Sequence, residues 1–506
     1  MDLELKRTAL NCYQMVVSTT VCQEETQESI VPDACPDIQK IVEVCGQVYM
    51  TGKQARDGMA TVSGVVEVSV LYIPENERCL RRMEMHLSFD AQAVAPGLTP
   101  QGTVFASPRL RWAEARALNP RKVLLRADLA IDIRACQPCE VSAVEEAMGE
   151  DDGVQQLQET RSAYQLSSVE EKAFTFSESL RLPGQGEPGE ILAVRGIPVC
   201  TESKLIGSKL IFKGNVEISL LLSEGEKTPE ASYHQVPFSQ VMELPGVGED
   251  GDCDVKIELT QLDLFPSQEG GRTVELQMEF LAQAMVHCRR TVTLLKDVYS
   301  TAWDMETEQE PLSLHDLGDL IVLPQTIREI IETPVSVRQI IDCWAVPGET
   351  KQNRDNTQMQ LSCDLHLTVL YLDEEGEMQS IHRAVTAAAK IDCEAQMLCR
   401  SRCQCMGEVY ATPSAGGIEM RCTAEFQCSL LVQTKSTFIS KAKQGEARSH
   451  SNGTQPSVVL RLAMPGEGLW DIAKHYGTTK SKILAANELE EEEIPIGKML
   501  LIPRAR

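Results

Sequence analysis

The chain lacks both a long apolar run and a cluster of basic residues. No stretch approaches the roughly 18 consecutive apolar residues that a membrane-spanning helix needs. Its 74 acidic residues outnumber its 48 lysines and arginines, which gives a formal net charge of −26. Because such a chain repels the phosphates of nucleic acids and the surface of an anionic membrane, the composition argues against either as a partner.

The motifs of nucleotide and hydrolytic chemistry are missing as well. The sequence has no GxxxxGK[ST] loop, no GxGxxG turn between a strand and a helix, and no HExxH pair. Its eight histidines are dispersed, without a Ser or Cys motif beside them. Acids are so abundant that two carboxylates close in sequence do not indicate a glycosidase site. We therefore expect a protein that is not an enzyme and uses no cofactor.

The N-terminus has no apolar core of the kind that a signal peptide carries. Its first ten residues, MDLELKRTAL, mix acids and bases with apolar residues. We therefore expect the protein to be made and kept inside a cell. In a reducing compartment the 18 cysteines are expected to be free and mostly buried thiols.

Two groups of cysteines have spacings that occur in redox or metal sites. Cys136 and Cys139 form a CxxC, but no second CxxC or histidine pair follows, which favours ordinary cysteines at a strand end. A denser group consists of Cys393, Cys399, Cys403 and Cys405. The alternation in CQC places the last two thiols on one face of a strand, which favours a structural role without a metal. Zinc binding by this denser group stays an open alternative.

Most of the first 440 residues are predicted to be short β-strands. Runs of alternating apolar and polar residues are separated by Gly, Pro, Asp and Asn. The run VEVSVLY at 66–72 recurs as VEISLLL at 216–222 and as LHLTVLY at 365–371. The starts of these runs lie 150 and then 149 residues apart. A spacing this constant indicates an internal repeat.

A second strand pattern follows each of these runs. It occurs at 123–133, 274–285 and 418–428. Two matched strands at a constant offset predict three tandem copies of one β-rich domain. The predicted boundaries are 1–150, 165–310 and 318–440, with a polar linker at 441–456 that is expected to be flexible.

The copies differ in detail. Gly64 and Gly214 precede the first matched strand in copies one and two, whereas copy three lacks this glycine. Leu222 of copy two replaces the tyrosine found at positions 72 and 371, so copy two is expected to be the most diverged. The acidic segments between the copies, such as 139–164 and 299–317, are expected to favour helix.

The last fifty residues predict a separate strand–helix–helix–strand module at 457–506. A strand at 458–464 is followed by a helix whose apolar stripe contains Leu469, Ile472 and Tyr476. Gly477 is placed to end this helix and Thr479 to cap a second one. The run MLLIP at 499–503 closes the module as a strand.

This module resembles the LysM family. The resemblance rests on PGEGLWDIA at 465–473, YGT at 476–478, Asn487 with Leu489, and the run at 497–503. It implies a small α+β (βααβ) fold with a shallow groove between two loops, where N-acetylglucosamine polymers bind largely through backbone groups. Carried over by position, the groove would consist of Gly466, Glu467, Gly468, Leu469, Leu489, Ile494, Pro495 and Ile496.

The module departs from the LysM pattern at the groove. Glu467 and Gly468 stand where the family commonly has Asp-Thr, and Arg461 stands where it has an aromatic residue. An acidic run at 490–493 borders the second loop. Because peptidoglycan stems carry carboxylates, these departures argue against tight glycan binding, although they leave the predicted fold unchanged.

The whole chain resembles the SipL-like endospore coat-assembly family, which has SPOCS repeats and a C-terminal LysM domain. The resemblance rests on this architecture, on the runs VSVLY and LTVLY, and on VPDACPDI at 31–38. It implies a scaffold in the mother-cell cytoplasm at the forespore surface, where the spore coat begins. It also implies that the LysM domain binds the coat-basement ATPase, SpoIVA. The alternative is a peptidoglycan-binding protein, and whether the groove takes protein, glycan or both stays open.

Overall fold

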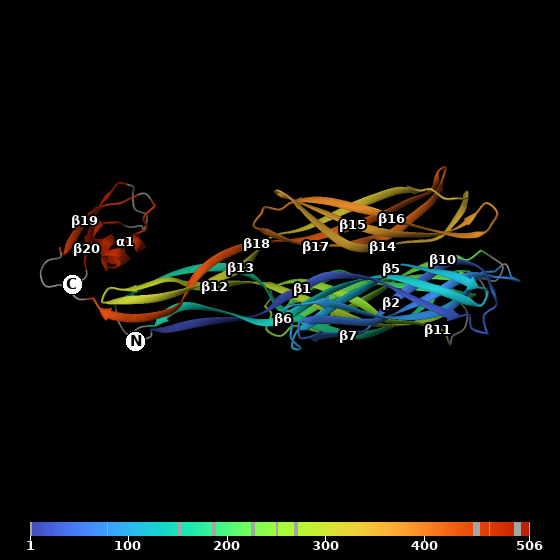
Figure 1. Ribbon diagram of the computed structural model, residues 1–506, viewed down its shortest axis with the longest axis horizontal. Coiled ribbons are helices and arrows are strands. Elements are labelled where there is room, and N and C mark those ends of the chain that lie inside the picture. The colour runs from blue at the N-terminus through green and yellow to red at the C-terminus, as the bar shows by residue number, and fades with distance from the viewer. Residues whose placement is uncertain are drawn as a thin grey trace.

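The computed structural model is an elongated β protein with a long stalk at one end (Figure 1). It describes residues 3–77, 79–148, 153–184, 189–223, 228–248, 251–267, 272–448, 456–464, 466–489 and 497–504. A small domain with two short helices lies at the end of the stalk, beside the N-terminus. A mostly β chain with a small α+β module is what the sequence predicted.

The first unit consists of six antiparallel strands in two sheets. They are β1 (Glu4–Ile30), β2 (Ile38–Arg56), β3 (Met59–Pro74), β4 (Arg81–Val94), β5 (Thr103–Asn119) and β6 (Lys122–Met148). One sheet has the order β2-β3-β4, and the other contains β1-β6-β5. Alternate apolar residues of both sheets, such as Val66 and Leu129, are fully buried against each other.

Units two and three repeat this topology. Unit two consists of β7 (Val154–Arg181), β8 (Glu190–Ile206), β9 (Lys209–Ser223), β10 (Glu230–Glu243), β11 (Gly251–Pro266) and β12 (Thr273–Ser300). Unit three consists of β13 (Trp303–Ile331), β14 (Val337–Asp355), β15 (Gln358–Asp373), β16 (Met378–Asp392), β17 (Met397–Ser414) and β18 (Gly417–Ala447). The first matched run lies in the third strand of each unit, and the second lies in the sixth. The prediction of three similar β-rich domains is confirmed.

The segments between the units are strands, so the expectation of helix at 139–164 and 299–317 was wrong. Unit two begins with β7 at Val154, before the expected 165, and unit three begins with β13 at Trp303, before the expected 318. Strand β18 runs to Ala447, so the first residues of the expected linker at 441–456 belong to unit three. The physical reason is burial, because alternate residues of these acidic segments pack into the stalk and override local preference.

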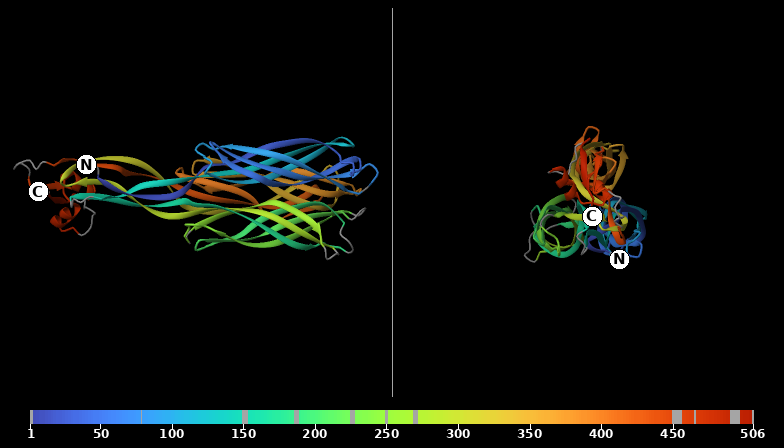
Figure 2. Two further views of the ribbon diagram at one scale, coloured as in Figure 1. Left: turned by 90° about the horizontal axis from the view of Figure 1, so that it is seen from below. Right: turned by 90° about the vertical axis from the view of Figure 1, so that its left-hand side faces the viewer.

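The three units surround a common axis, as the end-on view in Figure 2 shows. Residues at equivalent positions meet there in one buried cluster. They include Leu71, Leu221 and Leu370 from the third strands, and Val42, Leu192 and Ile341 from the second strands. Each unit therefore contributes the same two positions to a shared core, which joins the repeats into one body.

A buried ion pair joins units two and three beside this core. Arg195 of β8 donates to Asp342 of β14 at 2.9 Å, and the Tyr233 hydroxyl donates to the same carboxylate at 2.6 Å. The Arg195 guanidinium also lies 3.9 Å from the centre of the Trp344 ring, within range of a cation–π contact. Units one and three are joined by His382, whose Nε2 lies 3.3 Å from a carboxylate oxygen of the buried Glu43.

The glycine that copy three lacks faces an aromatic ring in the other two copies. Gly64 pairs with Phe89 across β3 and β4, and Gly214 pairs with Phe238 across β9 and β10. In unit three the same position pairs Cys363 with Ala387. Unit three therefore has two small side chains where the other units have a glycine opposite an aromatic ring.

The stalk is built from the first and last strands of all three units. The pairs β1/β6, β7/β12 and β13/β18 extend beyond the lobes toward one end of the molecule (Figures 1 and 2). Their apolar residues, such as Val144, Leu294 and Phe438, form one buried cluster. Burial on this scale makes the stalk part of the folded body.

Candidate functional site

The terminal module has the predicted order of elements. It consists of β19 (Val458–Leu462), α1 (Leu469–Tyr476), α2 (Lys480–Asn487) and β20 (Met499–Pro503). Ile472 of α1, Ile483 of α2 and Leu500 of β20 are buried together in its core. Gly477 ends α1 in the left-handed conformation with φ 64°, and the Thr479 side chain accepts from Lys482 N at 3.2 Å.

The structure describes five of the eight predicted groove residues. The first loop is open at Gly466, where an added Cβ would meet no atom within 4 Å, whereas a Cβ at Gly468 would lie 3.2 Å from Asp471 Oδ2. Leu469 and Leu489 pack against the same core, Leu469 fully and Leu489 partly. Ile494, Pro495 and Ile496 lie outside the described residues, as does the acidic run at 490–493.

The side chain of Leu469 lies in the core of the module, so a ligand in the predicted groove would meet the backbone of this residue. It is 3% exposed because it begins α1 on the face that packs against the core of the module. A charge introduced at this position would therefore unfold the module, whatever the groove binds. The helix register that the sequence predicted explains this burial.

Two of the departures from the LysM pattern, Arg461 in β19 and Glu467 in the first loop, contact each other. The Arg461 guanidinium donates to the Glu467 carboxylate, and it lies 5.6 Å from the centre of the Tyr476 ring. Glu467 also accepts from Met464 N at 3.3 Å. Its charge is thus neutralised within the module. The sequence alone gave no reason to connect these two positions.

The side of the small sheet that points away from the helices is an exposed aliphatic surface, which we call the outer face. It consists of Val458, Leu460, Leu462, Met464, Met499 and Leu501. Leu460 is 64% exposed and stands opposite Leu501 in the register of β19 and β20. Alternation puts Val459, Leu500 and Ile502 on the inner side against the helices. Exposed apolar patches of this kind mark surfaces that bind other molecules.

The module is fixed to the tip of the stalk through α1. Trp470 Nε1 donates to Asp297 Oδ2 at 2.8 Å, and Lys474 Nζ donates to both oxygens of that carboxylate at 2.7 Å. The Tyr299 hydroxyl donates to the Thr478 carbonyl at 2.8 Å, and its ring contacts Trp470 edge-on. Sequence reasoning missed Asp297 and Tyr299, because a β-bulge after Leu295 sets the direction of these side chains.

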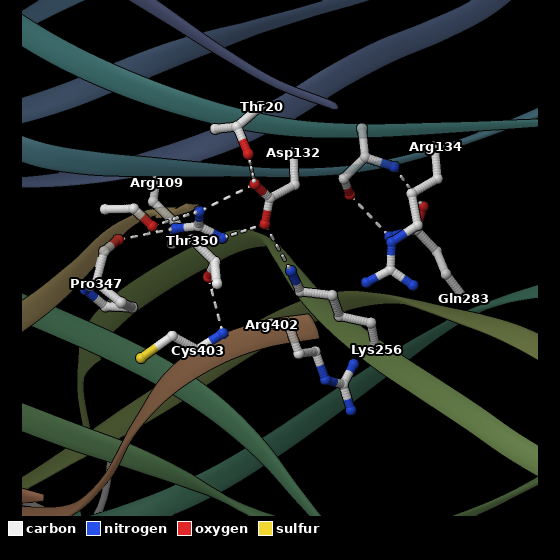
Figure 3. Close-up of polar contacts among 12 residues, drawn as sticks. Thr20, Arg109, Asp132, Arg134, Lys256, Gln283, Pro347, Thr350, Arg402 and Cys403 are labelled. Atoms are coloured by element: carbon white, nitrogen blue, oxygen red, sulfur yellow. Dashed lines mark hydrogen bonds and ion pairs between the residues drawn. The ribbon is translucent and has the colours of Figure 1, made fainter. Parts of the chain in front are cut away.

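A second polar cluster lies where the three units meet (Figure 3). Asp132 of unit one accepts from Arg109 and Thr20, and Lys256 of unit two lies 3.6 Å away. Burial alone would raise the pKa of Asp132, but Arg109 and Lys256 outweigh it and hold the pKa well below its usual range.

Unit three completes this cluster. Arg402 of β17 and Arg134 of β6 both donate to Asp254 of β11, at 2.6 and 2.8 Å. Backbone groups also join the units, since the Gln283 amide accepts from Ala106 N and donates to Ala106 O. The adjoining cavity measures ≈ 20 Å³, which is room for about one water. The cluster therefore links the units and offers no space for a substrate.

The denser cysteine group is dispersed among separate contacts. Cys399 interacts with Cys428 of the neighbouring strand, and Cys403 with Cys363 of the opposite sheet. The Arg354 guanidinium donates to Cys393 Sγ at 3.3 Å. Within the described ranges, no three His, Cys, Asp or Glu residues are grouped in a way that suits a metal ion.

Comparison with known families agrees with this architecture. The protein-family model described as SipL, SPOCS domain, matches residues 37–118 and 187–265. The family model of the LysM domain matches residues 465–503. The first two segments contain strands two to five of units one and two. No curated protein and no solved structure matches the chain.

The chain contains two segments similar to the SPOCS domain of SipL and a C-terminal LysM domain, as the resemblance to SipL-like proteins requires. Its SPOCS and LysM domains are of non-catalytic binding types, and they indicate a sporulation-related protein of the peptidoglycan-binding class. Copy two, which we expected to be the most diverged, is one of the two matched copies, and neither segment lies in unit three. Of the helices in the described ranges, none has the length and hydropathy that a bilayer crossing requires.

Replacing Ile472 by alanine is expected to unfold the LysM domain while the SPOCS body stays folded. Ile472 is buried at the centre of the small core, and truncating such a side chain costs about 2–5 kcal/mol. A domain of this size has little stability to lose. Limited proteolysis of the full chain should release the body without an intact LysM domain. Leu460→Ala, an exposed position, is the control, and equal protease resistance of both variants would contradict the prediction.

Proposed function

We propose that this protein is a non-enzymatic adaptor of endospore coat assembly. Its LysM domain would bind a coat morphogenetic protein, the SpoIVA-like coat-basement ATPase, in the mother-cell cytoplasm at the forespore surface. The SPOCS body would be the scaffold that holds the LysM domain at a defined place. The resemblance of the whole chain to the coat-assembly family supports this partner.

The observation that carries the proposal is the outer face of the LysM domain. Its six large side chains are all aliphatic, and Leu460 and Leu501 stand opposite each other at its centre. Sugars are bound through hydrogen bonds and aromatic stacking, which these side chains do not provide. An aliphatic face gains free energy by burial against another apolar protein surface.

The loop predicted to form the groove borders this face. Met464 lies just before the loop that contains Gly466, and Met499 lies just after Gly497. A protein partner that covers the outer face would therefore also reach Gly466, Gly468 and the second loop. We include Glu467, Leu489, Ile494, Pro495 and Ile496 in the proposed contact region, and Leu469 through its backbone, because its side chain belongs to the core.

The attachment of the LysM domain to the stalk supports the role of the body. Asp297 and Tyr299 hold α1, which lies on the opposite side of the module from the outer face. This orientation leaves the outer face uncovered by the rest of the described chain, since Leu460 and Leu462 stay exposed. Docking by α1 thus orders the module and keeps its aliphatic surface available.

Charged substitutions on the outer face test the proposal. Leu460→Asp and Leu501→Asp in the full chain are expected to weaken binding of the purified coat-basement ATPase at least about tenfold, because a carboxylate would be desolvated in the contact. The matched control is Leu320→Asp on β13, where the leucine is 50% exposed and far from the LysM domain. Binding is measured by titration of the ATPase.

Sedimentation with purified peptidoglycan decides between the two partner classes. The adaptor proposal expects little sedimentation, with no change in either outer-face variant. Strong sedimentation of the wild-type chain together with no binding of the ATPase would make this a peptidoglycan-binding protein. The LysM match is the reason to carry that second candidate.

A further inference from the structure

Two thiols that are far apart in sequence face each other at the base of the stalk. Cys12 of β1 and Cys139 of β6 are directly opposite in the antiparallel register, and their sulfur atoms lie 3.2 Å apart. Both are free thiols in the structure. Cys139 belongs to the CxxC motif, but its partner is a residue 127 positions away.

The other cysteine of the motif points elsewhere. Cys136 and Cys139 are three residues apart on one strand, so their side chains lie on opposite faces of the sheet. Cys136 is buried in a cluster with Phe105 and Leu166. The CxxC spacing therefore does not define a redox pair in this fold, whereas the pairing of β1 with β6 does.

We propose that Cys12 and Cys139 are a disulfide-forming site, oxidised by a small-molecule disulfide such as oxidised glutathione. Directly opposite residues of an antiparallel pair have Cα atoms about 4.5–5.5 Å apart, within the range that disulfides span. The sulfur atoms have to approach by about 1.2 Å to reach bonding distance. Side-chain rotation supplies a movement of this size without a change of strand register.

The reaction proceeds by two thiol–disulfide exchanges. The Cys139 thiolate attacks one sulfur of oxidised glutathione, which breaks its S–S bond and releases one glutathione thiolate. The Cys12 thiolate then attacks the Cys139 sulfur and releases the second glutathione. Two protein thiols are oxidised, one glutathione disulfide is reduced to two thiols, and the protons lost by the cysteines go to the released thiolates.

Direct opposition on paired strands, together with exposure, makes this pair different from the other close cysteines, since Cys363 and Cys403 belong to different sheets. Cys139 is half-buried and accessible to a small disulfide, whereas Cys12 is buried behind it. Cys399 and Cys428 are both buried, and their strands pair them diagonally, because Leu430 stands opposite Cys399. Burial together with the Cys139 contact raises the pKa of Cys12 to about 12, so the second exchange is expected to be the slower one.

The bond would join the first and last strands of unit one where they enter the stalk. It would close a loop of nearly the whole unit, and disulfides that close long loops restrict the unfolded chain most. Oxidation is therefore expected to raise the melting temperature of the full chain by several degrees. The free thiols expected in a reducing compartment are the starting state of this reaction.

The test is to incubate the full-length chain with oxidised glutathione, alkylate the remaining thiols and map the peptides without reduction. The expected result is loss of two of the 18 thiols and a linked pair of peptides that contain Cys12 and Cys139. Cys139→Ser should abolish the link and the rise in melting temperature. Cys136→Ala is the matched control and should keep both.

Two outcomes would overturn the proposal. One is a link between Cys136 and Cys139, or between buried pairs such as Cys399 and Cys428, while Cys12 stays alkylated. The other is full alkylation of all thiols after prolonged oxidation of the folded chain. Should Cys139→Ser fail to fold, Cys12→Ala provides the same readout from the other strand.

Discussion

Replacing Asp342 by alanine is expected to lower the free energy of unfolding by about 3–5 kcal/mol. The Asp342 side chain is 3% exposed, and Arg195, its partner across units two and three, is 11% exposed. Without the carboxylate, Arg195 would stay buried as an unpaired cation, and the Tyr233 hydroxyl would lose its acceptor. Denaturant unfolding, followed by the fluorescence of the tryptophans, measures the change.

Three further variants separate this ion pair from general effects of mutation. Asp342→Asn keeps an acceptor and should cost less than the alanine. The double replacement Arg195→Met with Asp342→Leu removes both charges, so it should also cost less than Asp342→Ala. Glu308→Ala breaks an exposed pair with Lys441 and should stay within about 0.5 kcal/mol of the wild type. A loss for Asp342→Ala no larger than that for Glu308→Ala would contradict a buried contact between the units.

Gly214→Ala is expected to destabilise unit two by about 3 kcal/mol or more. A Cβ at this position would lie 2.0 Å from the Val199 carbonyl oxygen and 2.7 Å from the Phe238 ring. Overpacking of a core usually costs about 1–3 kcal/mol, and here a backbone atom of the neighbouring strand would have to move as well. The free energy of unfolding of the full chain, with protease sensitivity of unit two, measures the effect.

A glycine in open space is the control for this substitution. A Cβ added at Gly248 would meet no atom within 4 Å, and its φ is ordinary, so Gly248→Ala should be close to neutral. Phe238→Ala combined with Gly214→Ala should recover only part of the loss, because the contact with the Val199 carbonyl remains. If Gly214→Ala were as mild as Gly248→Ala, the strands would not approach as closely as the structure has them.

Unit three shows how the repeat tolerates a side chain at this position. Its β14 bulge lies between Pro347 and Thr350, just before Thr350 pairs with Cys363, and Ala387 replaces the aromatic ring. In unit two the bulge comes after Cys200, which pairs with Gly214 itself. The shifted bulge and the smaller neighbour together make room for the Cys363 side chain. Replacing only the aromatic ring in unit two would not make equal room at Gly214.

The sequence was sufficient to predict the repeat and the LysM module. Alternation of apolar residues with period 2 marks half-buried strands, and the recurrence of 66–72 at 216–222 and 365–371 placed equivalent strands without any structure. The helical stripe with Ile472, the cap at Thr479 and the stop at Gly477 are likewise local patterns. Such features depend on residues that are close together in the chain, so they can be predicted from the sequence.

The boundaries of the units could not be predicted in this way. Segments such as 139–164 are acidic and have a helical preference of their own. They form strands because β6 pairs with β1, and β7 with β12, along the whole stalk. In the stalk these pairs join residues more than a hundred positions apart, as Glu4 and Met148 do. Pairing over that distance contributes more than the small differences in intrinsic preference.

In the candidate site as well, some features follow from neighbouring residues in the chain and others from distant contacts. The sequence by itself determined the LysM fold and the position of the first loop before α1, because short-range spacing sets both. Only the tertiary structure decided that Asp297 holds α1, that Arg461 neutralises Glu467, and that Cys139 faces Cys12. Each of these depends on which side chain a strand or helix presents to a distant element, and in a strand a one-residue bulge reverses that choice.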